Sequence, residues 1–323
     1  MDLSKTIEHL QSEVETHLTN LVKDHEPNEL YDSVRYVIAG GGKRLRPILL
    51  LLSAKIFGVT TQQAMPLALA VELVHNFSLV HDDMMDHADS RRGRETVHIR
   101  WNTDTAILCG DVLLALATEC VGKTNSDAQA NLTRVYGTMI RELCEGQALD
   151  MEIGHKADLT THDYLNMVDG KTGGLLSASI ELGGVIGGAD SETCHVLRQA
   201  GKSLGRAFQI LDDLLDLIAD DQRWGKVQGG DLMEGKGTYL LAESRQRAKG
   251  DDSAFFAKIR PGSGLTHEEI PLARSKMEAL GILDDARQKV HDYTSNAFTQ
   301  VQSIVGNTDE LGALIRHMSH RIY

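Results

Sequence analysis

From Ala64 to His81 the sequence reads as a helix that is apolar almost all round, and it runs directly into an acidic cluster that begins at Asp82. Such a helix belongs in the centre of a helical core, because every one of its faces needs apolar neighbours. A second apolar helix leads in the same way into an acidic cluster that begins at Asp212. We therefore expect a helical core that carries two acidic clusters at helix ends.

Helical periodicity covers most of the remaining chain, whereas alternating strand patterns bounded by turn signals are hard to find. The expected helical runs span residues 105–121, 132–150, 172–186 and 196–219, with several more after Thr266. Two stretches interrupt this pattern: Gly40–Pro47, and Trp224–Gly237 with its five glycines. The sequence therefore predicts one all-α domain over residues 1–323, with its polar clusters at the ends of helices.

Composition narrows the possible functions. The net charge of −13 argues against a nucleic-acid partner, because such binding depends on Lys and Arg that neutralise phosphates. The four cysteines form no close-spaced pair, which indicates reduced thiols in a cytoplasmic protein. The N-terminus lacks the apolar core of a signal peptide, and no segment is expected to supply the roughly 20 apolar residues that span a bilayer.

The first acidic cluster has the spacing of a cation site. Asp82, Asp83 and Asp86 are three and four residues apart, so their carboxylates can reach one side of a helix end. Carboxylates this close repel one another unless a cation neutralises them, and hard oxygen ligands suit Mg²⁺. A solvated acidic helix end is the plain alternative, and the pair His81–Asp82 also resembles metal phosphohydrolases.

The second cluster, Asp212, Asp213 and Asp216, repeats this spacing and weakens both alternatives. Two such clusters in one helical chain are not expected by chance, and a phosphohydrolase leaves the second one unexplained. Aspartates inside an apolar helix are costly unless a metal or a cationic partner satisfies them. The two clusters together predict several Mg²⁺ ions around one diphosphate.

Basic residues follow each cluster and also occupy the early glycine-rich loop: Arg91, Arg92, Lys226, Lys236, Lys43, Arg44 and Arg46. Arg forks onto phosphate oxygens and Lys supplies a point charge, although each of these residues alone also fits an ordinary surface position. The loop lacks the spacing of a nucleotide phosphate loop. His75 lies two helical turns before Asp82 and is either a phosphate donor or a core histidine.

These motifs together resemble the trans-prenyl diphosphate synthase family, the polyprenyl synthetases. The resemblance covers roughly residues 35–240 and rests on GGGKRLRP, VHNFSLVHDDMMDHADSRRG, Lys171-Thr172, FQILDDLLD and the loop to Lys236, in that order. It implies the isoprenoid synthase type I fold, a single-domain bundle of long helices around a deep central cavity. It also implies a homodimer, and its pattern is closest to geranylgeranyl diphosphate synthases.

The resemblance assigns roles by position. It implies that Asp82, Asp83, Asp86, Asp212, Asp213 and Asp216 hold Mg²⁺, three ions per active site, on the allylic diphosphate. It places Arg91, Lys171, Thr172, Gln209, Lys226 and Lys236 on the allylic side. It places Lys43, Arg46, His75 and Arg92 in the pocket for isopentenyl diphosphate.

The implied reaction is head-to-tail condensation of isopentenyl diphosphate with dimethylallyl, geranyl or farnesyl diphosphate. Metal ions and bases stabilise the departing diphosphate, while Thr172 and Gln209 favour the carbocation. The proton is then lost to the departed diphosphate, because no motif side chain is an obvious base. Phe77, with Ser78 beside it, resembles the floor of the product cavity in synthases of geranylgeranyl diphosphate, the C20 product.

Other outcomes stay open at this point. The C15 farnesyl product and longer polyprenyl products are the nearest alternatives, and a Phe77 ring that packs away from the cavity would leave the length unassigned. A class I terpene cyclase shares the helical fold but normally has a different second metal motif and needs no isopentenyl pocket. A non-catalytic subunit of a heteromeric synthase tends to lose motif residues, and none is lost here.

Overall fold

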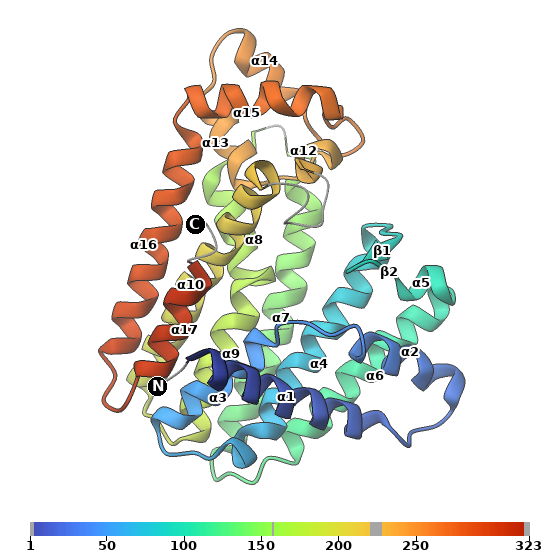
Figure 1. Ribbon diagram of the computed structural model, residues 1–323, viewed down its shortest axis with the longest axis vertical. Helices are drawn as coiled ribbons and strands as arrows, with labels where there is room; N and C mark the ends of the chain where they lie inside the picture. Colours follow the sequence, from blue (N-terminus) through green and yellow to red (C-terminus); the bar gives the residue numbers. More distant parts are fainter. Residues whose placement is uncertain (1–2, 157, 220–227, 320–323) are drawn as a thin grey trace. The chain divides into compact units, whose positions relative to one another are not determined.

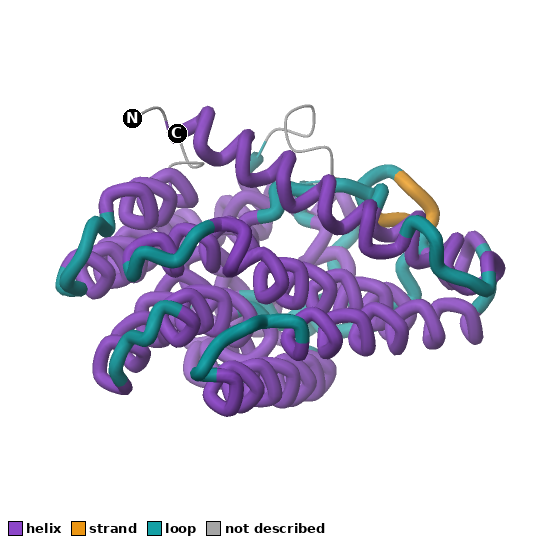
Figure 2. Tube along the Cα trace, turned by 90° about the horizontal axis from the view of Figure 1, so that it is seen from below, coloured by secondary structure: helices purple, strands orange, loops and turns teal. Residues whose placement is uncertain are grey.

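The computed structural model describes residues 3–156, 158–219 and 228–319. In these ranges the chain is built from helices joined by loops, with one short pair of strands, as Figures 1 and 2 show. The prediction of an all-α fold is confirmed. The chain divides into two compact units, and the expectation of a single domain stays a prediction.

Unit 1 comprises residues 1–140, 178–198 and 304–311. Its elements are α1 (Leu3–Val22), α2 (Asn28–Ile38), α3 (Leu45–Ile56), α4 (Thr61–Met85), β1 (Ser90–Arg91), β2 (Arg94–Glu95), α5 (Val97–Arg100) and α6 (Thr103–Gly122). Helix α7 (Gln129–Ile153) begins in this unit and ends in unit 2. Helix α4 packs against α1, α2, α3, α5 and α6, so it is central within the unit, as its apolar sequence predicted.

Unit 2 comprises residues 141–177, 199–303 and 312–323. Besides parts of α7, α9 (Gly173–Ile186) and α10 (Ser191–Ile218), it contains α8 (Thr161–Lys171), α12 (Gly230–Glu234), α13 (Tyr239–Arg247), α14 (Asp251–Ala257), the 3₁₀ helix η1 (His267–Glu269), α15 (Ile270–Ala279), α16 (Ile282–Gln302) and most of α17 (Asp309–Ser319). An apolar core that includes Leu214, Tyr239 and Phe256 joins α8, α10, α12, α13, α14, α15 and α16. The end of α10, with the second acidic cluster, is therefore embedded in packed surroundings.

Helix boundaries follow the apolar periodicity within a few residues, and one loop is shorter than expected. The glycine-rich break predicted over Gly40–Pro47 ends at Arg44, because α3 begins at Leu45 and Pro47 lies in its first turn. Proline is tolerated there, since the first N–H groups of a helix have no intrahelical partner. The basic loop is therefore only a few residues long and is held directly against the start of α3.

Two helices, α4 and α6, are long and apolar enough to cross a membrane by length and composition alone. The expectation that no segment reaches this length was wrong on that criterion. The apolar window of α4 is 72% buried inside the protein, and a core helix passes the same test. We interpret α4 as the core helix of unit 1, whereas the window of α6 is 44% buried and leaves apolar surface uncovered.

Candidate active site

Helix α4 places the first acidic cluster at its C-terminal end, in unit 1. A capping box between Thr60 and Gln63 fixes the start of the helix. Asp82 and Asp83 lie in its last turn, and Asp86 is the C-cap residue. Carboxylates at this end oppose the helix dipole, at a cost of about 0.3–1 kcal/mol each. Their presence here indicates a role that requires negative charge.

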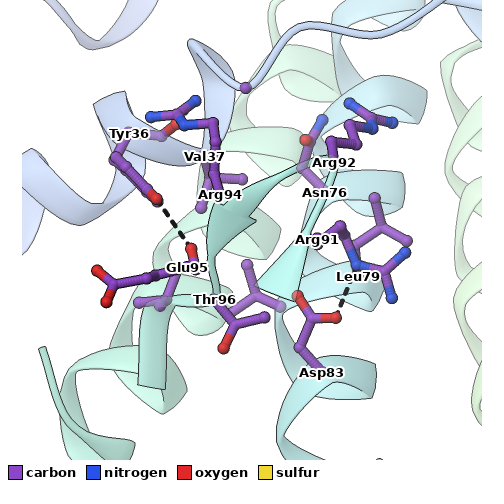
Figure 3. Close-up of a pocket in the computed structure, with 13 residues that line it drawn as sticks. Tyr36, Val37, Asn76, Leu79, Asp83, Arg91, Arg92, Arg94, Glu95 and Thr96 are labelled. Carbon is purple, nitrogen blue, oxygen red and sulfur yellow. Dashed lines mark hydrogen bonds and ion pairs between the residues drawn. The ribbon is translucent and has the colours of Figure 1, made fainter. Parts of the chain in front are cut away.

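Arg91 neutralises part of this charge. Its Nε donates to Oδ1 of Asp83 at 2.7 Å (Figure 3). Its Nη2 lies 3.9 Å from Oδ2 of Asp82. Burial raises the pKa of Asp83 above its usual value, and the Arg91 guanidinium opposes that rise. The structure therefore brings Asp82, Asp83 and Arg91 together, as the sequence predicted.

The strand pair β1–β2 positions Arg91 and Arg92 toward different neighbours. The two strands are antiparallel, and the turn between them consists of Arg92 and Gly93, both with positive φ. The backbone twist of such a two-residue turn matches the twist of the two strands that it joins. A positive φ is uncommon for a residue other than glycine, so Arg92 is unusual in this position. The Arg92 side chain donates to the carbonyl oxygen of Gly41. Gly42, next to this carbonyl, has φ of 145°, a backbone conformation that favours glycine.

Arg44 and Glu72 form an ion pair beside this loop. Nη1 of Arg44 donates to Oε1 of Glu72 at 2.7 Å, and its Nη2 donates to the Ile38 carbonyl oxygen. Both charged side chains are buried, and Arg44 has a left-handed backbone with φ of 49°. Removing one partner of a buried pair leaves an uncompensated charge, so the pair fixes the path of the glycine-rich loop. Glu72 was not predicted from the sequence, although an acidic residue within an otherwise apolar helix could have indicated a buried partner.

Arg46, His75 and Arg92 form a crowded cationic group next to this pair. Nη1 of Arg46 lies 3.2 Å from Nε2 of His75. Burial lowers the pKa of His75 well below its usual value, and the charges of Arg46 and Arg92 lower it further. His75 is therefore neutral, with Nε2 as the acceptor from Arg46. Its predicted donation to a phosphate stays a prediction.

The same crowding affects the guanidinium groups themselves. Burial and neighbouring arginines lower the pKa of Arg46 and of Arg92, while Glu72 opposes the shift in both. Among the residues that the structure describes, the buried Nε atom of Arg46 finds no hydrogen-bond partner. Positive groups that repel one another in a partly desolvated site favour the binding of an anion. A guanidinium group can donate two hydrogen bonds to the oxygens of one phosphate.

A cavity of about 460 Å³, which includes space open to solvent, lies beside these groups within unit 1 (Figure 3). It is lined by Tyr36, Asn76, Asp83, Arg91, Arg92 and Arg94, among others. Asp83, Arg91 and Arg92 were predicted as site residues, whereas Tyr36 and Arg94 were not. The guanidinium carbon of Arg94 lies 3.8 Å from the centroid of the Tyr36 ring, an attraction that holds the β2 end of the hairpin against α2.

The second acidic cluster lies near the C-terminal end of α10, in unit 2. Asp213 is buried, and its Oδ2 accepts from the backbone N–H of Tyr239 at 2.9 Å. Burial raises the pKa of Asp213 to about 7, although the hydrogen bonds from the Tyr239 backbone N–H and from Gln209 oppose the rise. The negative charge of this carboxylate is thus costly without a cation.

Thr172, Gln209 and Asp213 form a hydrogen-bonded chain. Oγ1 of Thr172 donates to Oε1 of Gln209 at 2.8 Å, and Nε2 of Gln209 donates to Oδ1 of Asp213 at 3.2 Å. An ionised Asp213 only accepts, so it fixes the orientation of the Gln209 amide. The Thr172 proton is then engaged with Gln209, and its oxygen lone pairs remain to face a positive group. The sequence predicted all three residues, but not their order.

Asp216 contacts Asp231, an acidic residue that was not predicted from the sequence to belong to the site. Oδ2 of Asp216 accepts from the backbone N–H of Asp231 at 3.1 Å. Burial and the charges of Asp216 and Asp213 raise the pKa of Asp231 to about 8. The available signal was the position of Asp231 directly after two glycines in the loop that leads to Lys236.

The predicted lysines have different surroundings. Nζ of Lys171 donates to Oδ2 of Asp150 at 2.6 Å, and that aspartate was not predicted. Nζ of Lys236 lies 2.7 Å from Glu234 and 3.9 Å from Asp231, so it joins the second acidic group. Lys43 is exposed in the glycine-rich loop. Lys226 lies outside the described residues.

The acidic residues fit a divalent cation that a ligand helps to hold. In the described ranges, no three His, Cys, Asp or Glu side chains form a complete metal site by themselves. Mg²⁺ typically binds one or two carboxylates together with phosphate oxygens, so a complete protein cage is not required. The raised pKa values of Asp213 and Asp231 show that negative charge is costly at this site. Hard oxygen donors of this kind suit Mg²⁺.

The two residues predicted to set product length lie on α4 in unit 1. The Phe77 ring stacks edge-on against His81, with ring centroids 4.8 Å apart. The Ser78 hydroxyl donates to the backbone oxygen of His75 at 2.8 Å, so its polar group is satisfied within the helix. Their role as a cavity floor stays a prediction.

The chain is similar to known proteins over most of its length. The model of the polyprenyl synthetase family matches residues 27–269. A geranylgeranyl diphosphate synthase of Methanosarcina mazei is 38% identical over 295 residues, which is 91% of this chain and 89% of that protein. One of Sulfolobus acidocaldarius is 31% identical over 315 residues, 95% of each chain.

A solved structure is similar to this chain over nearly its whole length. The crystal structure of the geranylgeranyl pyrophosphate synthetase from Pyrococcus horikoshii matches with a TM-score of 0.92 and 33% sequence identity. The match covers 99% of this chain and 100% of that one.

Proposed function

Because the chain belongs to the polyprenyl synthetase family, we propose that it joins isopentenyl diphosphate head-to-tail to an allylic diphosphate and releases geranylgeranyl diphosphate. The family resemblance inferred from the motifs is confirmed, and the chain is a prenyltransferase. The C20 product is supported by the archaeal relatives that carry this name and by the phenylalanine at position 77. Two acidic clusters at helix ends, each accompanied by basic residues, carry the proposal.

The cationic group of unit 1 would bind isopentenyl diphosphate. Arg46 and Arg92 supply guanidinium groups whose mutual repulsion a diphosphate relieves. Neutral His75 holds Arg46 through its Nε2 atom and adds no further positive charge. Lys43, which is exposed in the neighbouring loop, would approach the same anion.

Carboxylates of the two acidic clusters would hold Mg²⁺. When bound, the metal supplies charge neutralisation of the allylic diphosphate, which makes it a better leaving group. The three ions expected per active site stay a prediction. Arg91 neutralises Asp82 and Asp83, so these residues are already paired with a cation before any ligand arrives.

The hydrogen-bonded chain of unit 2 would stabilise the electron-poor allylic carbon. Thr172 donates its proton to Gln209, so the hydroxyl oxygen presents lone pairs to a developing positive charge. Gln209 is held by Asp213 and therefore keeps this orientation. Preorganised dipoles of this kind lower a barrier because they do not reorient during the reaction. The proton released after condensation would pass to the diphosphate leaving group.

We also propose a homodimer. Among the large apolar side chains, Ile107 and Leu108 of α6 are 42% and 53% exposed, and Met85 of α4 and Ile99 of α5 are exposed nearby on helices that pack against α6. Exposed apolar groups of this size mark an interaction surface, and a second copy of the chain would cover them. A cytoplasmic location fits the four free cysteines.

The test is turnover by the purified chain alone. The protein is incubated with Mg²⁺, labelled isopentenyl diphosphate and, separately, dimethylallyl, geranyl or farnesyl diphosphate, and the dephosphorylated products are separated by chromatography. A C20 product supports the proposal, whereas a C15 or longer product keeps the reaction and overturns the product length. Product formed from an allylic diphosphate without isopentenyl diphosphate would identify a terpene cyclase. No reaction with any primer would indicate a partner-dependent subunit.

A further inference from the structure

Helix α6 approaches α4 without an intervening side chain at one point, directly beneath His81 (Figure 1 labels both helices). A Cβ added at Gly110 would lie 2.1 Å from Nε2, 2.5 Å from Cδ2 and 2.9 Å from Cε1 of His81. The imidazole therefore rests on the bare backbone of Gly110. Its Nε2 also lies 3.3 Å from the carbonyl oxygen of Ile107, one turn earlier on α6.

The same imidazole also contacts Phe77. The two rings meet edge to face, with an interplanar angle of 66° and centroids 4.8 Å apart. They are four residues apart on α4, so they lie on the same helix face. An aromatic pair in this geometry attracts beyond the effect of its buried area. His81 thus links the backbone of α6 to the Phe77 ring.

We propose that His81, seated on Gly110, is a positioning residue that holds the Phe77 ring in the orientation that limits product length. This inference rests on the proposed role of Phe77 in the prenyltransferase. Residue 110 must then lack a side chain, because any Cβ there displaces the imidazole and removes the support of Phe77. Product length would depend on α6 as well as on the residues that precede Asp82 in α4.

The test compares product distributions of the homogeneous, full-length protein. His81→Ala removes the supporting ring, and Gly110→Ala displaces it from its seat. Both are expected to raise the ratio of C25 to C20 product about two- to tenfold, which is the range that the loss of one aromatic pair allows. Gly122→Ala is the matched control on the same helix, because a Cβ at Gly122 meets nothing within 4 Å. Its product ratio should equal that of the wild-type protein.

Phe77→Ala separates this inference from the function on which it rests. If it lengthens the product, the floor role holds, and His81→Ala in the Phe77→Ala background should change the ratio no further. An additive effect in that double variant would show that His81 acts by itself and would overturn the proposal. Unchanged ratios in both His81→Ala and Gly110→Ala would do the same. No lengthening by Phe77→Ala would overturn the floor role and the proposal together, while prenyl transfer itself stands.

Product ratio is the chosen readout because a merely structural defect lowers the total yield without redistributing products. His81 precedes Asp82, so a loss of rate alone in His81→Ala would reflect the acidic cluster and counts against the proposal. The double variant His81→Ala with Gly110→Ala adds a second check. Once the imidazole is absent, the extra methyl group has no ring to displace, and the product ratio should match that of His81→Ala alone.

Discussion

Substitution of Asp213 by asparagine is expected to stabilise the metal-free protein at alkaline pH while it removes activity. Burial raises the pKa of Asp213 from 3.8 to about 7, so the folded protein binds this proton more tightly than the unfolded chain does. The contribution of this group to stability is therefore greatest at low pH, falls as the pH rises from about 4 to about 7, and is constant above that range. The asparagine side chain carries no charge at any pH, so the substitution should abolish this fall.

The magnitude follows from the size of the shift. A change of this size corresponds to about 4 kcal/mol at pH 8, which is an upper figure for a buried carboxylate beside Asp231. The two oxygens of Asp213 each accept one hydrogen bond, from Gln209 and from Tyr239, whereas asparagine has one acceptor oxygen, so one of these bonds is lost at a cost of about 1–2 kcal/mol. The variant should thus gain about 2–3 kcal/mol at pH 8 and nothing at pH 4.

The assay is chemical unfolding in EDTA at several pH values, with activity measured in parallel. Asp292→Asn is the control, because this exposed carboxylate on α16 accepts from Gln288 and its loss should change stability by less than about 0.5 kcal/mol. Added Mg²⁺ with a diphosphate should stabilise the wild-type protein more than the variant. If Asp213→Asn destabilises the metal-free protein at pH 8, or keeps full activity, the buried charge is not held for a cation and the reasoning fails.

Three further predictions address the other groups of the site. Thr172→Val should lower kcat on the order of 100-fold, because it removes the oxygen that faces the cation. Thr172→Ser keeps this oxygen and should retain activity. Kinetic measurements of both variants would check this, and an unchanged kcat in Thr172→Val would exclude the role. Arg46→Lys should raise KM for isopentenyl diphosphate about 10-fold with little change in the allylic KM, since one charge-assisted hydrogen bond is lost; equal effects on both substrates would contradict the assignment of this pocket. Leu108→Glu should convert a dimer into a monomer in light-scattering measurements, because it places a charge in the exposed apolar surface of α6; a dimer that survives would move the interface elsewhere.

Much of the fold follows from the sequence because apolar periodicity is a local signal. The run predicted over residues 105–121 became α6, Thr103–Gly122, and the run over 196–219 became α10, Ser191–Ile218. The hairpin β1–β2 was not predicted, since strands of two residues carry no periodicity. Its position depends on Arg91 and Arg94, which contact Asp83 and Tyr36 on other elements.

The acidic and basic motif residues were predicted individually, but their partners were not. Glu72, Asp150 and Asp231 are separated from Arg44, Lys171 and Asp216 by between 15 and 28 positions. No local pattern links residues at such separations, so only the folded chain reveals these pairs. The sequence predicts that Thr172 and Gln209 both favour the cation, and the structure adds that Thr172 donates to Gln209 and that Gln209 donates to Asp213.

The residues that conflict with ordinary folding rules concentrate where the chemistry is proposed. Asp82 and Asp83 oppose the dipole of α4, Arg44 and Arg92 have left-handed backbones, and Asp213 is buried with a raised pKa. A divalent cation would relieve the negative charge of the acids. The left-handed backbones of Arg44 and Arg92 are instead held by their hydrogen bonds to the carbonyl oxygens of Ile38 and Gly41. Product length has no such signature, because a Phe77 ring held by His81 over Gly110 is an ordinary apolar contact. The charged residues of the site can therefore be predicted from the sequence, and the family resemblance implies the type of reaction, whereas the size of the product would depend on how α4 and α6 pack.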